Sequence, residues 1–269
     1  MIITLVVIAL IITIIILYRQ LNDAKLHIKL ANRKIQDLTA SKDEFIKLTS
    51  HQLLTPLTAI KGYLSMLISG SGGKINTQQK IFLNQTLDAT ELMVNVVLEL
   101  LNVSRITSGK FKIDQKPINL ADLVDDQVNK LKSMATSKNI KLNYKKPKIY
   151  PLVKLDEDKI KMIINNLIRN SIYYSKNKDA EIDIELTSNN EIEFKIIDNG
   201  IGVPENDKAH IFNNFYRASN AKILRPDGIG VGLYLTKVTI RKQGGEIIFE
   251  SSEGKGSTFG FKFNKQIKV

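Results

Sequence analysis

The sequence contains no cysteine and only three histidines, His27, His51 and His210. Without cysteine the chain has no disulfide, no cysteine-ligated zinc and no thiol nucleophile, and three scattered histidines leave little for a metal cage. Zinc-finger spacings and aromatic RNA-binding signatures are also missing, and the lysines behind the net charge of +12 are spread along the chain. We therefore expect no nucleic-acid partner, because an anionic lipid surface or a nucleotide accounts for the charge equally well.

Charged residues are missing from the start of the chain. Ile2 to Tyr18 is an uncharged apolar run, and as a helix it is about 25 Å long, at the short end of a membrane span. A secretory signal peptide fits less well, because no Lys or Arg precedes the run and no A-x-A cleavage pattern follows it. Basic residues do follow it, so we expect a single-pass anchor in the cell membrane, surrounded by lipid, with the remainder cytoplasmic.

A seven-residue repeat of apolar side chains comes next. Its two series are Leu21, Ile28 and Ile35, and, three residues later, Ala24, Ala31, Leu38 and Phe45. Such a seam predicts a parallel coiled coil and hence a homodimer. A single exposed helix that packs on its own domain is the alternative.

A second helical stretch, about Lys42 to Ser69, continues the first. Its apolar stripe consists of Leu53, Leu57, Ile60, Leu64 and Leu67. His51 lies on the opposite side of the helical wheel. Pro56 has no N–H to give to the carbonyl of Gln52, so we expect the helix to bend one turn past His51. Four glycine and serine residues, 70–73, end this helix, and a periodic stretch from Leu83 to Leu101 predicts a helix that returns. Two such hairpins in a dimer make a four-helix bundle.

From Lys110 onward strands and helices alternate, so the chain as a whole is of the α+β class. We expect strands near Phe111 to Ile113 and Lys141 to Tyr144, and in the runs E-I-D-I-E-L, E-I-E-F-K-I-I-D, E-I-I-F-E-S and S-T-F-G-F-K-F. Helices are expected from Leu120, from Asp156 to Tyr174 and from Val231. Gly109 and the polar residues around it mark the expected hinge.

Three motifs of this second domain carry chemistry. Asn166 and Asn170 are one helical turn apart, where their amide oxygens can reach Mg²⁺ or phosphate. Asp198 ends a strand and can accept a hydrogen bond from an exocyclic amine such as that of adenine. Gly228 to Leu233, G-I-G-V-G-L, opens a helix and can bind phosphate through its amides. Each glycine pattern is common by itself, but the ordered set is specific.

These motifs, in this order, resemble those of bacterial two-component sensor histidine kinases over about Lys42 to Phe263. S-H-Q-L-L-T-P-L-T resembles their H box, N-L-I-R-N-S-I-Y-Y-S the N box, and D-N-G-I-G-V and G-I-G-V-G-L the two glycine boxes. I-F-N-N-F-Y-R resembles the F box and G-K-G-S-T-F the last strand motif. The resemblance implies a dimeric helical hairpin followed by an α/β sandwich ATP-binding domain of the GHKL type.

The resemblance also implies roles for matching residues. His51 would take the γ-phosphoryl group of ATP and pass it to the receiver-domain aspartate of a response regulator, and Arg217 would stabilise charge on that group. Asn170, helped by Asn166, would hold Mg²⁺. The residues that would bind nucleotide are Asn166, Asn170, Tyr174, Asp198, Gly200, Gly202, Gly228, Gly230, Gly232 and Thr258. The implied domains are 1–18 (transmembrane helix), 19–41 (coiled coil), 42–108 (dimerisation and phosphotransfer) and 109–269 (ATP binding).

The sequence departs from the family pattern at Gln52, Leu54, Tyr173 and Asn213. The family usually has Glu or Asp where Gln52 stands, and an amide cannot take a proton from the imidazole as a carboxylate can. Lys or Arg is usual at Tyr173. Thr55 stands where the family orients water for dephosphorylation of the regulator, although a plain helix-surface role is the alternative. Other interpretations are a GHKL-type ATPase without phosphohistidine, or a membrane adaptor or phosphatase with weak kinase activity.

Overall fold

The computed structural model describes residues 2–175 and 179–264, and in the helix that begins at Ile2 the side chains of residues 2–16 and 43 lie outside the described ones. The chain divides into two compact units, Met1–Val97 with Ser104–Lys110, and Leu98–Val103 with Phe111–Val269. Helix α1, Ile2–Ile68, contains the expected membrane span in its first turns. Among the residues available for that comparison, no helix combines the length and apolarity needed to cross a membrane.

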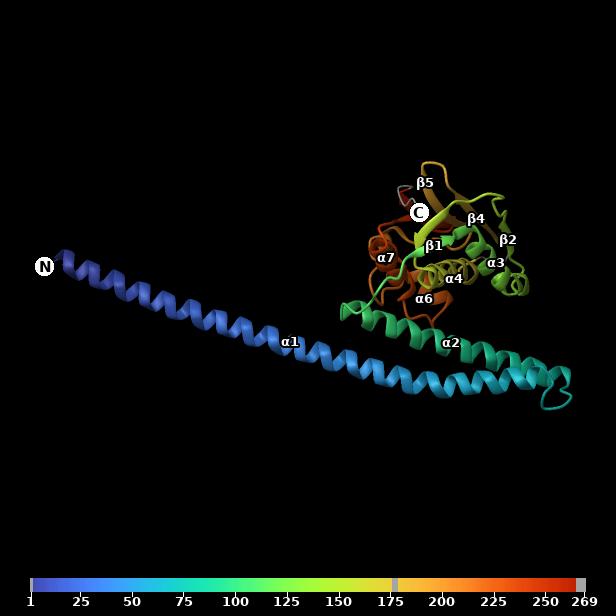
Figure 1. Ribbon diagram of the computed structural model, residues 1–269, viewed down its shortest axis with the longest axis horizontal. Coiled ribbons are helices and arrows are strands. Elements are labelled where there is room, and N and C mark those ends of the chain that lie inside the picture. The colour runs from blue at the N-terminus through green and yellow to red at the C-terminus, as the bar shows by residue number, and fades with distance from the viewer. Residues whose placement is uncertain (1, 176–178, 265–269) are drawn as a thin grey trace. The chain divides into compact units, whose positions relative to one another are not determined.

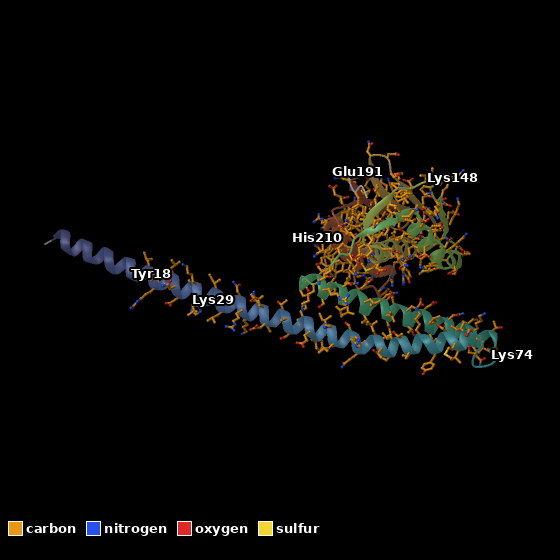
Figure 2. All side chains as sticks on the ribbon, in the orientation of Figure 1. Tyr18, Lys29, Lys74, Lys148, Glu191 and His210 are labelled. Atoms are coloured by element: carbon orange, nitrogen blue, oxygen red, sulfur yellow. The ribbon has the colours of Figure 1, made fainter. Side chains whose placement is uncertain are left out.

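The first unit is a helical hairpin, as predicted. Helix α1 is one uninterrupted helix of 67 residues, and α2, Thr77–Thr107, runs back beside its second half (Figure 1). The turn is well defined at both ends, because Ser71 donates its N–H to the carbonyl of Met66 and Asn76 caps α2 in a reciprocal capping box with Gln79. Figure 2 shows Lys74 at this turn, and Tyr18 and Lys29 on a stretch of α1 beside which no other part of the hairpin runs.

The hairpin core has a seven-residue period on both helices. Its buried layers are formed by Ser50, Leu57 and Leu64 on α1 and by Thr90, Val97 and Ser104 on α2. The apolar stripe predicted on α1 therefore divides into two. Leu57 and Leu64 are 7% and 9% exposed, whereas Leu53, Ile60 and Leu67 remain 44%, 45% and 40% exposed. Only half of the stripe is thus covered within one chain.

The second unit is a five-stranded sheet with helices on one face, the α/β sandwich expected (Figure 1). The strand order is β2 (Lys141–Tyr144), β4 (Glu181–Thr187), β5 (Glu191–Asp198), β7 (Gly256–Asn264) and β6 (Glu246–Ser252), and only the β2–β4 pair is parallel. The covering helices are α3 (Leu120–Ser137), α4 (Glu157–Tyr173) and α7 (Gly232–Lys242), and two short helices, α5 (Glu205–Lys208) and α6 (Ser219–Leu224), precede α7.

Strict alternation along β5 shows why the sheet has one apolar face. Ile192, Phe194 and Ile196 are buried in the main core, and Asp198 is the last residue of the same row. Three of the four alternate residues, Glu191, Glu193 and Lys195, are charged and form ion pairs, for example Lys195 with Glu193 at 2.6 Å. A carboxylate thus ends an otherwise apolar row.

One predicted strand is misplaced. Residues near Phe111 to Ile113 are not a strand, and the strand β1 lies at Lys116–Asn119, where it pairs antiparallel with β3, Leu152–Leu155, which was not predicted. Phe111 is buried as a single aromatic anchor and makes no ladder. Its hydrophobicity therefore reflects packing rather than strand pairing.

Candidate functional site

Asp198 is the centre of a buried polar cluster at the end of β5. Its Oδ1 accepts the N–H of Gly200 at 3.0 Å, its Oδ2 accepts the hydroxyl of Ser171 at 3.1 Å, and the backbone N–H of Ser257 is a third donor. Burial raises the pKa of Asp198, against the lowering effect of these three hydrogen bonds. A carboxylate has about four acceptor positions, so one is left for a ligand donor.

The loop after Asp198 requires close backbone approach. A Cβ on Gly200 would lie 2.4 Å from the carbonyl oxygen of Tyr174, the residue that caps the end of α4. The same carbonyl accepts the N–H of Ile201 at 3.0 Å. Gly202 has φ of +63° and packs on the backbone of Ser252. The loop and the end of α4 are therefore held together beside Asp198.

Asn166 of α4 packs on the start of α7. Its Nδ2 donates to Oγ1 of Thr236 at 3.2 Å, and a Cβ on Gly232 would lie 2.3 Å from its Oδ1. Asn170 lies one turn later on the same side of α4. The structure thus brings both asparagines and the first residue of α7 to one side of α4.

The side chains at this site fit Mg²⁺ only if water and phosphate oxygens complete its coordination shell. Among the residues that the structure describes, no three His, Cys, Asp or Glu side chains form a cluster able to hold a metal ion. Mg²⁺ commonly takes one or two protein oxygens and completes its shell with water and substrate phosphates. The amide oxygens of Asn166 and Asn170 suit that arrangement, and a metal held by the protein alone does not fit.

Arg217 binds the loop of residues 225–231, which we call the lid loop. Its Nη1 donates to the carbonyl of Pro226 at 2.9 Å, and its Nη2 donates to the carbonyls of Ala221 and Arg225. Gly228 and Gly230 of the lid loop lie against Arg217, and a Cβ on Gly228 would be 3.2 Å from its guanidinium. In this structure Arg217 therefore fastens the lid loop, a contact that the sequence did not predict.

Thr258 is not brought to Asp198. It pairs with Ile197 on the neighbouring strand, whereas Ser257 pairs with Asp198, and side chains of directly paired residues share a face. Ser257 and Ser171 are the residues that the sequence analysis missed. Each directly follows a residue that was named or quoted, Gly256 and Asn170, and Ser257 lies in the same alternating row of β7 as the buried Phe261 and Phe263.

His51 is exposed on α1, as predicted, while the preceding Ser50 is buried in the hairpin. Gln52 and Thr55 are also exposed. The hydroxyl of Thr55 donates to the carbonyl of His51 at 3.1 Å, a bond within the helix itself. The helix continues through Pro56, and the bend expected there stays a prediction.

Two family models match the chain. Residues 41–109 match the His Kinase A (phospho-acceptor) domain, and residues 155–267 match the Histidine kinase-, DNA gyrase B-, and HSP90-like ATPase. The chain belongs to the sensor histidine kinases of two-component systems. The resemblance seen in the motifs is therefore confirmed.

Two sequence relatives agree with this assignment, and one solved structure has a similar fold. The chain is 29% identical over 250 residues to the signal transduction histidine-protein kinase BarA of Escherichia coli (strain K12), covering 91% of this chain and 27% of that protein. It is 29% identical over 229 residues to the sensor histidine kinase WalK of Bacillus subtilis (strain 168), covering 84% of this chain and 37% of that protein. Full-length ShkA in complex with AMPPNP has a similar fold, with a TM-score of 0.59 and 20% sequence identity. The match covers 81% of this chain and 45% of ShkA.

Proposed function

We propose that this chain is an ATP-dependent protein-histidine kinase whose phosphoacceptor is His51. The observation that carries the proposal is that one chain holds an exposed histidine in the segment matching the phosphoacceptor domain and the Asp198 cluster in the segment matching the ATPase domain. The chain spans 27% of the first curated relative and 37% of WalK, so the activity of those whole proteins is carried over as a proposal.

The Asp198 cluster would bind adenine. The free acceptor position of its carboxylate suits the exocyclic amine, and Ser171 and Ser257 hold the carboxylate in place. Gly200 and Gly202 shape the loop, and Gly228, Gly230 and Gly232 shape the lid loop and the helix start. The AMPPNP complex of ShkA supports an adenine nucleotide as ligand.

Asn170, with Asn166, would hold Mg²⁺, which supplies positive charge to neutralise the phosphates. The other residues of the site would position the nucleotide. Arg217 would order the lid loop through its hydrogen bonds to the carbonyls of Pro226, Ala221 and Arg225.

In the transfer, a ring nitrogen of His51 would form a bond to the γ-phosphorus while the bond from that phosphorus to the ADP oxygen breaks. The proton on the other ring nitrogen must then leave. Gln52 can accept a hydrogen bond from the ring and fix its tautomer but cannot take the proton, so we expect slow transfer. The phosphoryl group would pass on to an aspartate of a response regulator. Thr55 is suited to orient water for the reverse dephosphorylation.

A homodimer would complete the hairpin. The exposed half of the α1 stripe, Leu53, Ile60 and Leu67, is the surface that a second copy would cover to form a four-helix bundle. We further propose that residues 1–18 anchor the chain in the membrane, that 19–41 form a coiled coil, and that 42–108 and 109–269 are the phosphotransfer and catalytic domains.

Incubation of the purified chain with γ-labelled ATP tests the proposal. We expect label that is acid-labile and alkali-stable in the wild type and is lost in His51→Ala. Released phosphate without labelled protein would instead identify an ATPase. Neither label nor hydrolysis, in a chain that still captures a response regulator, would identify an adaptor.

A further inference from the structure

Three cationic side chains surround the ring of Tyr173, the last residue of α4. The guanidinium carbon of Arg225 lies 3.9 Å from the ring centroid, the Nζ of Lys138 lies 4.6 Å from it, and the guanidinium carbon of Arg169 lies 5.6 Å from it. Such distances are those of cation–π contacts. Three positive charges therefore lie around Tyr173 at the end of α4.

This end of α4 belongs to the candidate nucleotide site. Tyr173 follows Asn170 by three residues and directly precedes Tyr174, whose carbonyl is bound to the loop after Asp198. A nucleotide held by Asp198 and Asn170 needs cations near its phosphates. Tyr173 itself carries no charge, and the cations nearest to this end of α4 are the three side chains that contact its ring.

The three cations are not equally free to serve. Arg169 donates to the hydroxyl of Tyr173 at 3.2 Å, which commits its Nη2. Lys138 caps the end of α3, an element that contributes none of the site residues. Arg225 is the first residue of the lid loop, and its backbone is fixed because Arg217 donates to its carbonyl.

Two carboxylates, those of Asp227 and Glu99, interact with Arg225, and a phosphate group could replace them as its partner. The Nε of Arg225 lies 3.2 Å from Oδ1 of Asp227, whose side chain is half exposed, whereas that of Arg225 is 18% exposed. Glu99, in the same compact unit, has its pKa raised by burial and lowered in part by Arg169 and Arg225. A guanidinium can bind phosphate bidentately, and a phosphate carries more charge than either carboxylate.

We propose that Arg225, held against the ring of Tyr173, is a phosphate-binding residue of the nucleotide site and supplies the positive charge that α4 lacks at position 173. Tyr173 is a positioning residue in this arrangement: it presents a flat aromatic face on which the guanidinium stacks. The proposal rests on the proposed nucleotide site and adds to it the residue that recognises the phosphates.

Equilibrium binding of ADP and of adenosine to the purified chain tests this proposal. For Arg225→Gln we expect ADP to bind roughly tenfold or more weakly, the loss typical of a charge-assisted hydrogen bond, and adenosine to bind as in the wild type. Lys138→Gln removes another cation from the same ring and is expected to leave both affinities unchanged. Tyr173→Lys in the Arg225→Gln background is expected to restore ADP binding.

Two results would overturn the assignment of Arg225. One is an unchanged ADP affinity in Arg225→Gln, and the other is an equal loss for ADP and adenosine, which would indicate a structural role only. A wild-type chain that binds neither ligand would overturn the nucleotide site itself, and this inference with it, so the two failures are distinguishable.

Discussion

The backbone N–H of Asp114 donates a hydrogen bond to Oδ2 of Asp156 across 2.9 Å. Asp156 also caps α4, because its Oδ1 accepts the N–H of Lys159 at 3.1 Å. Its own N–H donates to Oε1 of Gln243, just beyond α7, at 2.7 Å. One buried residue thus ties the segment after Gly109 to the start of α4 and the end of α7.

Phe111 strengthens this attachment. Its side chain is buried, and the Nζ atoms of Lys159 and Lys242 lie 5.1 and 5.9 Å from its ring centroid. The continuous part of the α/β unit therefore begins at Phe111, and Gly109, where the sequence predicts a hinge, has φ of +69° and lies two residues before it.

Asp156→Ala should loosen this attachment. The variant loses a helix cap, which costs about 1 kcal/mol, and also leaves the N–H of Asp114 without its acceptor. Hydrogen exchange should therefore accelerate across residues 111–119 and the first turn of α4. Glu157→Gln alters the neighbouring residue, which bonds only to Lys161 at the surface, and should leave exchange unchanged. Equal exchange in Asp156→Ala and the wild type would contradict the role of the carboxylate.

Asp198→Asn separates stability from binding. Because burial raises the pKa of Asp198 in the folded state, that state holds the proton more tightly than the unfolded chain does, and ionisation costs stability as pH rises above the usual value of 3.8. Removing the charge should therefore not lower the unfolding temperature at pH 7, and the difference from wild type should vanish below about pH 4. ADP affinity should fall about tenfold or more, because the amide removes an acceptor oxygen. A large loss of unfolding temperature at pH 7 would contradict this account.

Two glycines allow a matched comparison. Gly200 has no room for a Cβ, whereas a Cβ on Gly62, inside α1, would meet nothing within 4 Å. Gly62→Ala should raise the free energy of unfolding of the hairpin by about 1 kcal/mol through helix propensity. Gly200→Ala must displace the carbonyl of Tyr174 and should weaken ADP binding about tenfold or more. Calorimetric unfolding and ADP titration measure the two effects, and tight ADP binding by Gly200→Ala would contradict the close approach.

Sequence patterns predicted most of the architecture because periodicity follows burial. The strand predicted from the alternation of β5 and the helix predicted from the period of α4 are both present in the structure, and their predicted ends are correct to one residue. The failures came where tertiary contacts decide. Phe111 is apolar because it anchors a linker, and β3 is short and needs β1 as its partner. Ser257 was missed because a motif does not give the register between β5 and β7. The contacts that Arg217 and Arg225 make could not be predicted, since they depend on the path of the lid loop.

The two halves of the α1 stripe should respond differently to the same change. Leu57→Ser removes a buried side chain and should destabilise the hairpin by about 2 to 5 kcal/mol. Ile60→Ser alters the half that one chain leaves uncovered, so it should weaken the dimer while the helices remain formed. Light scattering in detergent solution, together with circular dichroism, measures both. A dimer of unchanged dissociation constant in Ile60→Ser would place the second copy elsewhere.

Gln52→Glu tests how the proton leaves His51. A carboxylate beside the imidazole could act as general base, which is typically worth 10²- to 10⁴-fold in rate, or about 3 to 5 kcal/mol of barrier. Gln52 is exposed and one residue from the phosphoacceptor, so the substitution disturbs no packing. Rapid-quench measurement of His51 labelling should show a faster rate with unchanged ADP affinity, and Gln52→Ala should not accelerate it. If Gln52→Glu labels no faster than the wild type, proton removal is not limiting and water or another group already takes the proton.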